Sequence, residues 1–97
     1  MNIDKELLEK IIEVFRKFDI DKAVLFGSRA RCDNRKNSDI DIAFYTKNRD
    51  VFHFLKDEMD QIETILKIDL FDALNLKKQA LIDGIKKDGI VIYRKDE

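Results

Sequence analysis

The residues best suited to chemistry in this 97-residue chain are acids set into apolar segments. Asp39 and Asp41 alternate with Ile40 and Ile42, so a strand here turns both carboxylates to the same face. Two carboxylates on one face repel each other unless a cation or a basic partner lies between them. Hard oxygen ligands of this kind suit Mg²⁺ or Mn²⁺. The alternative interpretation is a solvated edge with two exposed acids.

A third acid, Asp69, interrupts the otherwise apolar segment 68–71. If its strand lies beside the strand of Asp39 and Asp41, three carboxylates meet. Such a cluster next to a phosphate-binding turn is what two-metal phosphoryl chemistry requires, because the metals orient the nucleophile and stabilise the leaving oxygen. Asp72 is the alternative third acid, but it falls on the opposite face of the strand and is expected to begin a turn.

The pair Gly27-Ser28 follows the apolar run 23–26 and precedes a short expected helix at 28–31. Backbone N–H groups and a hydroxyl at such a turn could face an anion such as phosphate. A plain turn after a strand is the alternative interpretation of this pair. The polar segment 29–37 that follows is the one clear basic stretch of the chain.

The elements that must position these residues alternate between helices and strands. Apolar residues recurring every three or four positions predict helices over residues 4–18, 50–66 and 76–87. Asp4 is the expected N-cap of the first helix, and Gly89 is the expected stop of the last. Short apolar or alternating segments predict strands over residues 23–26, 39–45, 68–71 and 90–93. This order predicts a single α/β domain, residues 1–97, with a mixed sheet of about four strands flanked by helices.

Composition and charge limit the classes of function. The chain has 19 Lys and Arg against 20 Asp and Glu, which gives a net charge of 19 − 20 = −1. General nucleic-acid and anionic-membrane binders rely on excess positive charge, so neither partner is expected. No apolar run approaches the ~20 residues of a membrane span, and no targeting segment is recognisable. The single Cys32 excludes an intramolecular disulfide and a Cys-based zinc cluster, which favours a reducing, cytoplasmic compartment.

The remaining reactive or aromatic residues are less suited to chemistry. Cys32 is interpreted as a bystander thiol, because the one histidine lies far along the chain on a helix. That histidine, His53, is interpreted as a helix-surface or interface residue rather than a metal ligand. Phe52, Phe54 and Tyr45 are interpreted as mostly core residues, with a partner-binding patch as the alternative.

Two motifs taken together resemble a known family. Gly-Ser-Arg-Ala-Arg at 27–31, a short polar loop, and Ser-Asp-Ile-Asp-Ile at 38–42 resemble the signature of the minimal nucleotidyltransferases (MNT) of the DNA polymerase β superfamily. Within that family, the resemblance is to the MntA-like antitoxins of HEPN/MNT pairs. The segments 67–70 and 85–93 lie where the family has its third-acid strand and its terminal helix and strand. The resemblance implies a nucleotidyltransferase-like fold and transfer of a nucleotidyl group, AMP from ATP, to a hydroxyl acceptor with release of pyrophosphate.

The resemblance also implies roles for individual residues. Seven residues receive a role: catalytic and metal-binding Asp39, Asp41 and Asp69, and nucleotide-binding Gly27, Ser28, Arg29 and Ser38. Two Mg²⁺ ions are the implied cofactor, with Mn²⁺ as an alternative. For the arginines of this segment, a solvated basic loop is an equal alternative. Cys32 departs from the pattern, because the family usually has a glycine there, which adopts positive φ at little cost.

The acceptor is expected to be held by another protein, because the assigned elements leave no residues for a domain that grips it. In the family that the chain resembles, this partner is typically a small helical HEPN-type protein, often an RNase toxin. The implied function is then that of an antitoxin that adenylylates a tyrosine hydroxyl of its partner. A non-catalytic nucleotide-binding subunit and a small-molecule, antibiotic-type nucleotidyltransferase are the alternatives. Retention of all three carboxylates favours an enzyme.

Overall fold

Helix α1, Lys5–Lys17, illustrates how the sequence forms its elements. The Asp4 carboxylate accepts a hydrogen bond of 3.1 Å from the backbone N–H of Leu7 and so caps the first turn. The apolar stripe of the helix faces inward, and its buried residues are Leu7, Ile11, Val14 and Phe15. The predicted first helix and its N-cap are therefore confirmed.

The structure is a computed structural model that describes residues 1–95. The strands in this part of the chain are β1 (Lys22–Phe26), β2 (Ile40–Tyr45), β3 (Ile68–Asp72) and β4 (Ile90–Arg94). The helices that follow α1 are α2 (Ser28–Arg31), α3 (Val51–Asp60), the short 3-10 helix η1 (Ala73–Asn75) and α4 (Gln79–Asp88). Over the described residues, no helix is both long enough and apolar enough to cross a bilayer. The predicted α/β class, with four strands flanked by helices, is confirmed.

The four strands of the described chain form one mixed sheet in the order β3-β2-β1-β4. Strand β1 runs antiparallel to both β2 and β4, whereas β2 and β3 run parallel. The register places Asp41 of β2 beside Asp69 of β3 and across from Phe26 of β1. The strand that carries Asp69 therefore lies beside the strand that follows Asp39, which is the condition under which the sequence brings the three acids together.

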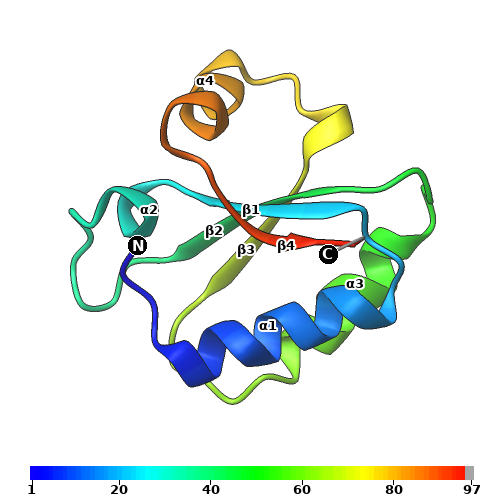
Figure 1. Ribbon diagram of the computed structural model, residues 1–97, viewed down its shortest axis with the longest axis horizontal. Coiled ribbons are helices and arrows are strands. Elements are labelled where there is room, and N and C mark those ends of the chain that lie inside the picture. Colours follow the sequence, from blue (N-terminus) through cyan, green and yellow to red (C-terminus); the bar gives the residue numbers. More distant parts are fainter. Residues whose placement is uncertain (96–97) are drawn as a thin grey trace.

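Helices cover the two faces of the sheet unequally. Helices α1 and α3 lie against one face and α4 lies against the other, as Figure 1 shows. The core lies on the α1 and α3 side, where Ile40, Ile42 and Phe44 of β2 are fully buried. The alternate residues of β2 point to the α4 side, and α4 itself has no buried residue. The alternation thus places the site acids on the less covered face of the sheet.

Two predicted helices have different bounds in the structure. The second, predicted to reach residue 66, ends at Asp60, because the chain must turn back to place β3 parallel to β2. Ile62 and Leu66 still pack against the core from the connecting segment, which explains why the apolar spacing continues. The last helix begins at Gln79 rather than residue 76, because the residues before it form η1 and a short extended segment.

The aromatic residues near α3 also differ from the sequence interpretation. Phe54 is 60% exposed and Phe52 is 37% exposed, so the expectation that they belong to the core is wrong. They fall off the inward stripe of α3, whose buried residues are Val51, Leu55 and Met59. The side chain of His53 is exposed on α3, as predicted.

Candidate active site

Gly27 joins β1 to α2 and lies directly against one of the acids. Its φ of +79° and ψ of −157° form a backbone conformation that residues with a side chain rarely adopt. A Cβ added at this position would lie 2.6 Å from Oδ2 of Asp41. The Gly27 carbonyl accepts hydrogen bonds from the N–H groups of Ala30 and Arg31, which forms the turn of α2. Both the backbone and the approach of Asp41 therefore require glycine here.

Asp41 lies in an environment that disfavours the negative charge of its carboxylate. Its pKa is raised from 3.8 to about 6, first by burial and then by the nearby carboxylates of Asp69 and Asp39. The positive charges of Arg31 and Lys67 act in the opposite direction without cancelling the increase. The three predicted acids are thus close enough to repel one another, and a cation at this face would relieve the repulsion.

An aromatic pair lies next to Asp41 in the sheet. Phe26 is the cross-strand partner of Asp41, and its ring meets that of Phe71 edge to face with centroids 5.4 Å apart. Phe71 lies two residues after Asp69, on the same face of β3. Asp41 therefore lies beside aromatic rings, where a carboxylate charge is less well hydrated than in open solvent.

Asp69 forms an ion pair with Lys67. Nζ of Lys67 lies 3.3 Å from Oδ1 of Asp69, whose side chain is 26% exposed. Asp39 is exposed and precedes β2. Among the described residues, no three His, Cys, Asp or Glu side chains converge closely enough to hold a metal ion. The acids lie on the same face of the sheet, and the charges of Asp39 and Asp69 act on Asp41. Their side chains do not converge on one point as the ligands of a metal ion would.

The donor chemistry of this face nevertheless fits a divalent metal. Carboxylate oxygens are the ligands that Mg²⁺ and Mn²⁺ prefer. Burial, and then the charges of Asp69 and Asp39, raise the pKa of Asp41 despite the opposing effect of Arg31 and Lys67, so a cation here would stabilise the charged carboxylate. The assignment of Asp39, Asp41 and Asp69 as metal ligands stays a prediction.

Asp72 lies apart from this group. Its carboxylate contacts the guanidinium of Arg49 at 2.9 Å and accepts hydrogen bonds from the Asn75 amide and the Leu74 backbone N–H. It caps η1, so the expectation that Asp72 begins a turn is confirmed.

Arg29 has a different environment from the other arginines of its segment. It is only 5% exposed, although it lies in the basic stretch. Its Nε donates to the carbonyl of Ser38, its two terminal nitrogens donate to the carbonyls of Asn2 and Lys36, and the distances are 3.0, 3.0 and 3.1 Å. The guanidinium therefore holds the loop before Asp39 against α2. Nothing in the sequence distinguishes this buried arginine from its exposed neighbours.

Other residues of the segment 31–38 also form hydrogen bonds that hold this segment in place. The Ser38 hydroxyl accepts a hydrogen bond of 2.8 Å from the backbone N–H of Arg35. Arg31 donates to Asp33 and to Asp88 at the end of α4, and these hydrogen bonds raise its pKa. Cys32, exposed at the end of α2, has a φ of +67°, so the position where the family usually has glycine does adopt positive φ.

Replacing Arg29 with lysine tests its positioning role. A lysine keeps the charge but lacks the planar fork that reaches three carbonyls, so we expect the free energy of unfolding to fall by about 1–2 kcal/mol. Chemical denaturation measures this change, and Arg35→Lys, an exposed position, is the matched control. If Arg29→Lys leaves stability unchanged but lowers ATP affinity, the side chain binds phosphate instead.

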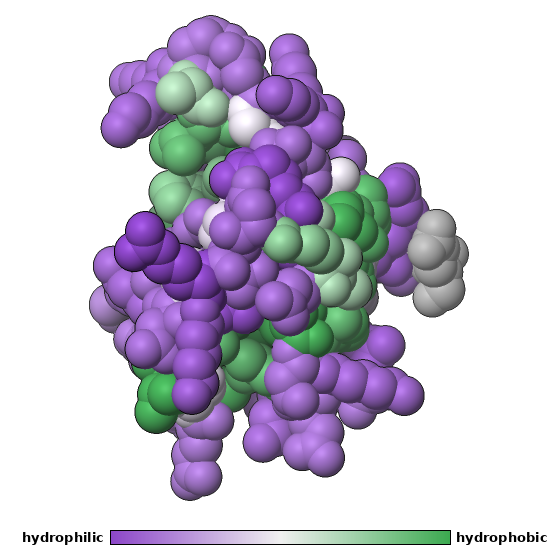
Figure 2. Space-filling model, turned by 90° about the vertical axis from the view of Figure 1, so that its left-hand side faces the viewer, coloured by the Kyte–Doolittle hydropathy of each residue, from purple (hydrophilic) through white to green (hydrophobic). Residues whose placement is uncertain are grey.

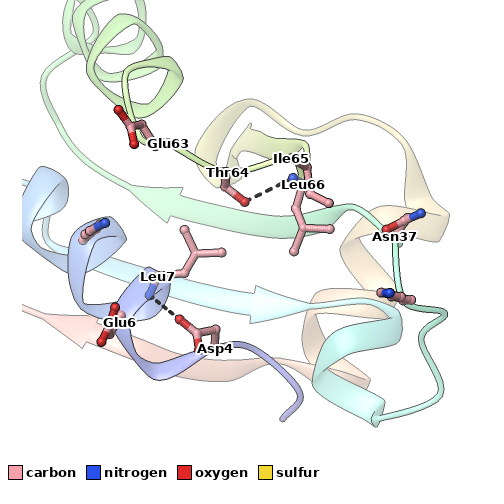
Figure 3. A pocket seen from close by; sticks show the side chains of 10 residues that line it. Asp4, Glu6, Leu7, Asn37, Glu63, Thr64, Ile65 and Leu66 are labelled. Atoms are coloured by element: carbon pink, nitrogen blue, oxygen red, sulfur yellow. Dashed lines mark hydrogen bonds between the residues drawn. The ribbon is translucent and has the colours of Figure 1, made fainter.

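The surface at this end of the molecule is open and polar. Figure 2 shows the end that carries α2 and the N-terminus, which is mostly hydrophilic with separate hydrophobic areas beside it. A distinct hollow of about 330 Å³ lies between the start of α1, the loop residues Lys36 and Asn37, and residues 63–66. Figure 3 shows Leu7 and Leu66 lining it from opposite sides. None of the three acids lines this hollow, so the carboxylate face is a separate site.

Comparison with known proteins agrees with the fold. The family profile described as Polymerase beta, Nucleotidyltransferase matches residues 9–97. No curated protein sequence matches the chain. A chain in a crystal structure of a toxin-antitoxin with AMP-PNP is 22% identical, with a TM-score of 0.66 over 92% of this chain and 74% of that chain. A chain of the MntA-HepT toxin-antitoxin is 21% identical, with a TM-score of 0.61 over 94% and 73%.

A third similar structure is a tri-AMPylated Shewanella oneidensis HEPN toxin in complex with MNT antitoxin. The matching chain is 21% identical, with a TM-score of 0.61 over 95% of this chain and 73% of that chain. At such identities these likenesses establish the fold alone. The fold and the family profile define a nucleotidyltransferase class of protein. The chain belongs to the polymerase beta nucleotidyltransferase family, which confirms the superfamily that the sequence motifs resemble.

Proposed function

We propose that the chain, acting as one domain, transfers AMP from ATP to a hydroxyl acceptor. The observation that supports this most is the set of three carboxylates, Asp39, Asp41 and Asp69, beside the Gly27 turn on neighbouring strands. The pKa of Asp41 is raised first by burial and then by the charges of Asp69 and Asp39, which suits a face that works with bound cations. The similarity to a toxin-antitoxin structure with AMP-PNP supports an adenine nucleotide as the donor.

In the proposed reaction, each part of the site has one role. The acceptor oxygen forms a bond to the α-phosphorus, the bond from that phosphorus to the β-phosphate oxygen breaks, and pyrophosphate leaves. The Gly27-Ser28 turn faces the phosphates, and Arg29 keeps the loop before Asp39 in place. Asp69 lies beside the acceptor hydroxyl and receives its proton. Two Mg²⁺ ions, held by Asp39, Asp41 and Asp69, would supply charge neutralisation and lower the pKa of the acceptor hydroxyl.

The proposed acceptor is a hydroxyl on a small helical HEPN-type protein, and the chain then acts as an antitoxin in the cytoplasm. The similar structures support this, since one is the MntA-HepT pair and another contains a tri-AMPylated HEPN toxin with MNT antitoxin. A tyrosine hydroxyl suits the reaction because its pKa of about 10 is already moderate.

Nucleotide and metal binding can be tested without the partner. Calorimetric titration with ATP is expected to give tighter binding with Mg²⁺ present than with a chelator, and Asp39→Asn is expected to remove the difference. Equal heats with and without Mg²⁺ would contradict the metal assignment.

A non-catalytic nucleotide-binding subunit is the second candidate. It is favoured by one observation, that the acids of the described chain do not converge into a metal-ligand group. The two candidates differ in whether the partner gains mass in units of AMP.

A further inference from the structure

Lys67 occupies a fixed backbone position next to the acids. Its carbonyl accepts a hydrogen bond of 2.8 Å from the Ile40 N–H, which anchors the start of β3 to the start of β2. It lies two residues before Asp69, so both side chains point to the same face. Nζ of Lys67 is 3.3 Å from Oδ1 of Asp69, while the Lys67 side chain is 71% exposed. The backbone of Lys67 is therefore fixed by strand pairing, while its ammonium group lies largely in solvent.

The other basic groups near the acids are bound elsewhere. The Arg29 guanidinium is hydrogen-bonded to three backbone carbonyls. The Arg31 guanidinium is hydrogen-bonded to Asp33 and Asp88. Among the ion pairs of residues 1–95, Lys67 supplies the cation that contacts one of the three acids. Neutralisation of Asp69 therefore depends on this lysine.

We propose that Lys67 is a tethered counter-ion, which neutralises Asp69 in the metal-free protein and is exchanged for a divalent cation when the site is loaded. The proposal rests on the proposed function, because it requires that Asp69 bind metal. In the exchange, the ammonium group leaves the carboxylate and returns to water, the cation takes its place on the oxygen, and no covalent bond changes.

Removing the lysine charge should therefore strengthen metal binding. Mn²⁺ alone is titrated into the protein without nucleotide, and free Mn²⁺ is followed by electron paramagnetic resonance. We expect Lys67→Gln to bind Mn²⁺ about two- to fivefold more tightly, the range that an exposed ion pair supplies. Lys67→Arg keeps the counter-ion and should remain close to the unmodified protein. Lys17→Gln, which removes an exposed lysine paired with Glu58 on the distant helices, controls for net charge.

The outcomes separate this proposal from the proposed function. If Lys67→Gln binds Mn²⁺ no more tightly than Lys17→Gln does, or binds it more weakly, the counter-ion role is overturned while the metal site stands. If the unmodified protein binds no Mn²⁺, or Asp41→Asn binds it equally well, the metal site itself is contradicted and the counter-ion role fails with it.

Discussion

Replacing Asp41 with asparagine is expected to stabilise the metal-free protein above pH 6 and to remove nucleotidyl transfer. The folded-state pKa of Asp41 is raised from 3.8 to about 6, so the folded protein binds a proton more readily than the unfolded chain does between those values. Its stability therefore falls as pH rises through this window. The cost is absent below about pH 3.8 and fully present above about pH 6. Asparagine carries no charge and avoids this cost.

The expected size of this effect is moderate. A rise of the Asp41 pKa from 3.8 to about 6 corresponds to roughly 3 kcal/mol, which solvent screening of this partly buried carboxylate reduces to roughly 1–2 kcal/mol. Asp41→Asn should then raise the melting temperature by about 5–10 °C at pH 7 in the presence of a chelator, with little difference at pH 4. Transfer activity should fall roughly 100- to 1,000-fold.

Thermal melts from pH 4 to pH 7 measure the stability, and nucleotide transfer is assayed on the same preparations. Asp57→Asn removes an exposed acid of α3 and should change neither quantity. A stability gain that does not vary with pH would show that Asp41 is not the titrating group.

Replacing Gly27 with alanine is expected to disturb both the turn between β1 and α2 and the side chain of Asp41 beside it. Alanine at a φ of +79° is strained, and its Cβ would lie 2.6 Å from Oδ2 of Asp41. Strain and overpacking together should lower the free energy of unfolding by about 2–4 kcal/mol. That loss corresponds to a fall in melting temperature of roughly 10–25 °C. ATP binding in the presence of Mg²⁺ should weaken as well, because Asp41 must move.

Gly84→Ala is the matched control for this substitution. Gly84 lies in α4, and the nearest atom to an added Cβ is Cδ2 of Phe26 at 4.0 Å, an ordinary contact. Alanine should stabilise the helix by up to about 1 kcal/mol. Calorimetric titration of both variants, at a temperature where each is folded, separates binding from stability. Unchanged ATP affinity in Gly27→Ala would mean that the turn and Asp41 are not part of the nucleotide site.

The sequence predicts those features that depend on local pattern. The period of two around Asp39 and Asp41 predicts that both carboxylates share one face of a strand. The pairing of this strand with the strand of Asp69 is known only from the structure. The cap at Asp4 follows from side-chain chemistry in the same way. The end of α3 could not be predicted, because Ile62 continues the apolar spacing after the helix has stopped.

Features that depend on how the chain folds around a residue cannot be predicted from the sequence. The burial of Arg29 requires the carbonyl of Asn2, which is 27 residues away. The family pattern has a glycine at the position of Cys32, and only the structure shows that Cys32 itself adopts a positive φ. The ion pair of Lys67 and Asp69 is close in sequence, but its importance depends on Arg29 and Arg31 being bound elsewhere.

The most direct test of the account is the intact mass of the partner. The chain is co-expressed with a small helical HEPN-type protein, the kind of partner proposed above, and the complex is purified and measured by mass spectrometry. The account predicts that the partner gains mass in units of AMP, and that the gain disappears with Asp39→Asn and with Asp41→Asn while the complex still forms. A stable complex in which the partner's mass never changes would contradict nucleotidyl transfer to the partner and leave the chain as a binding subunit.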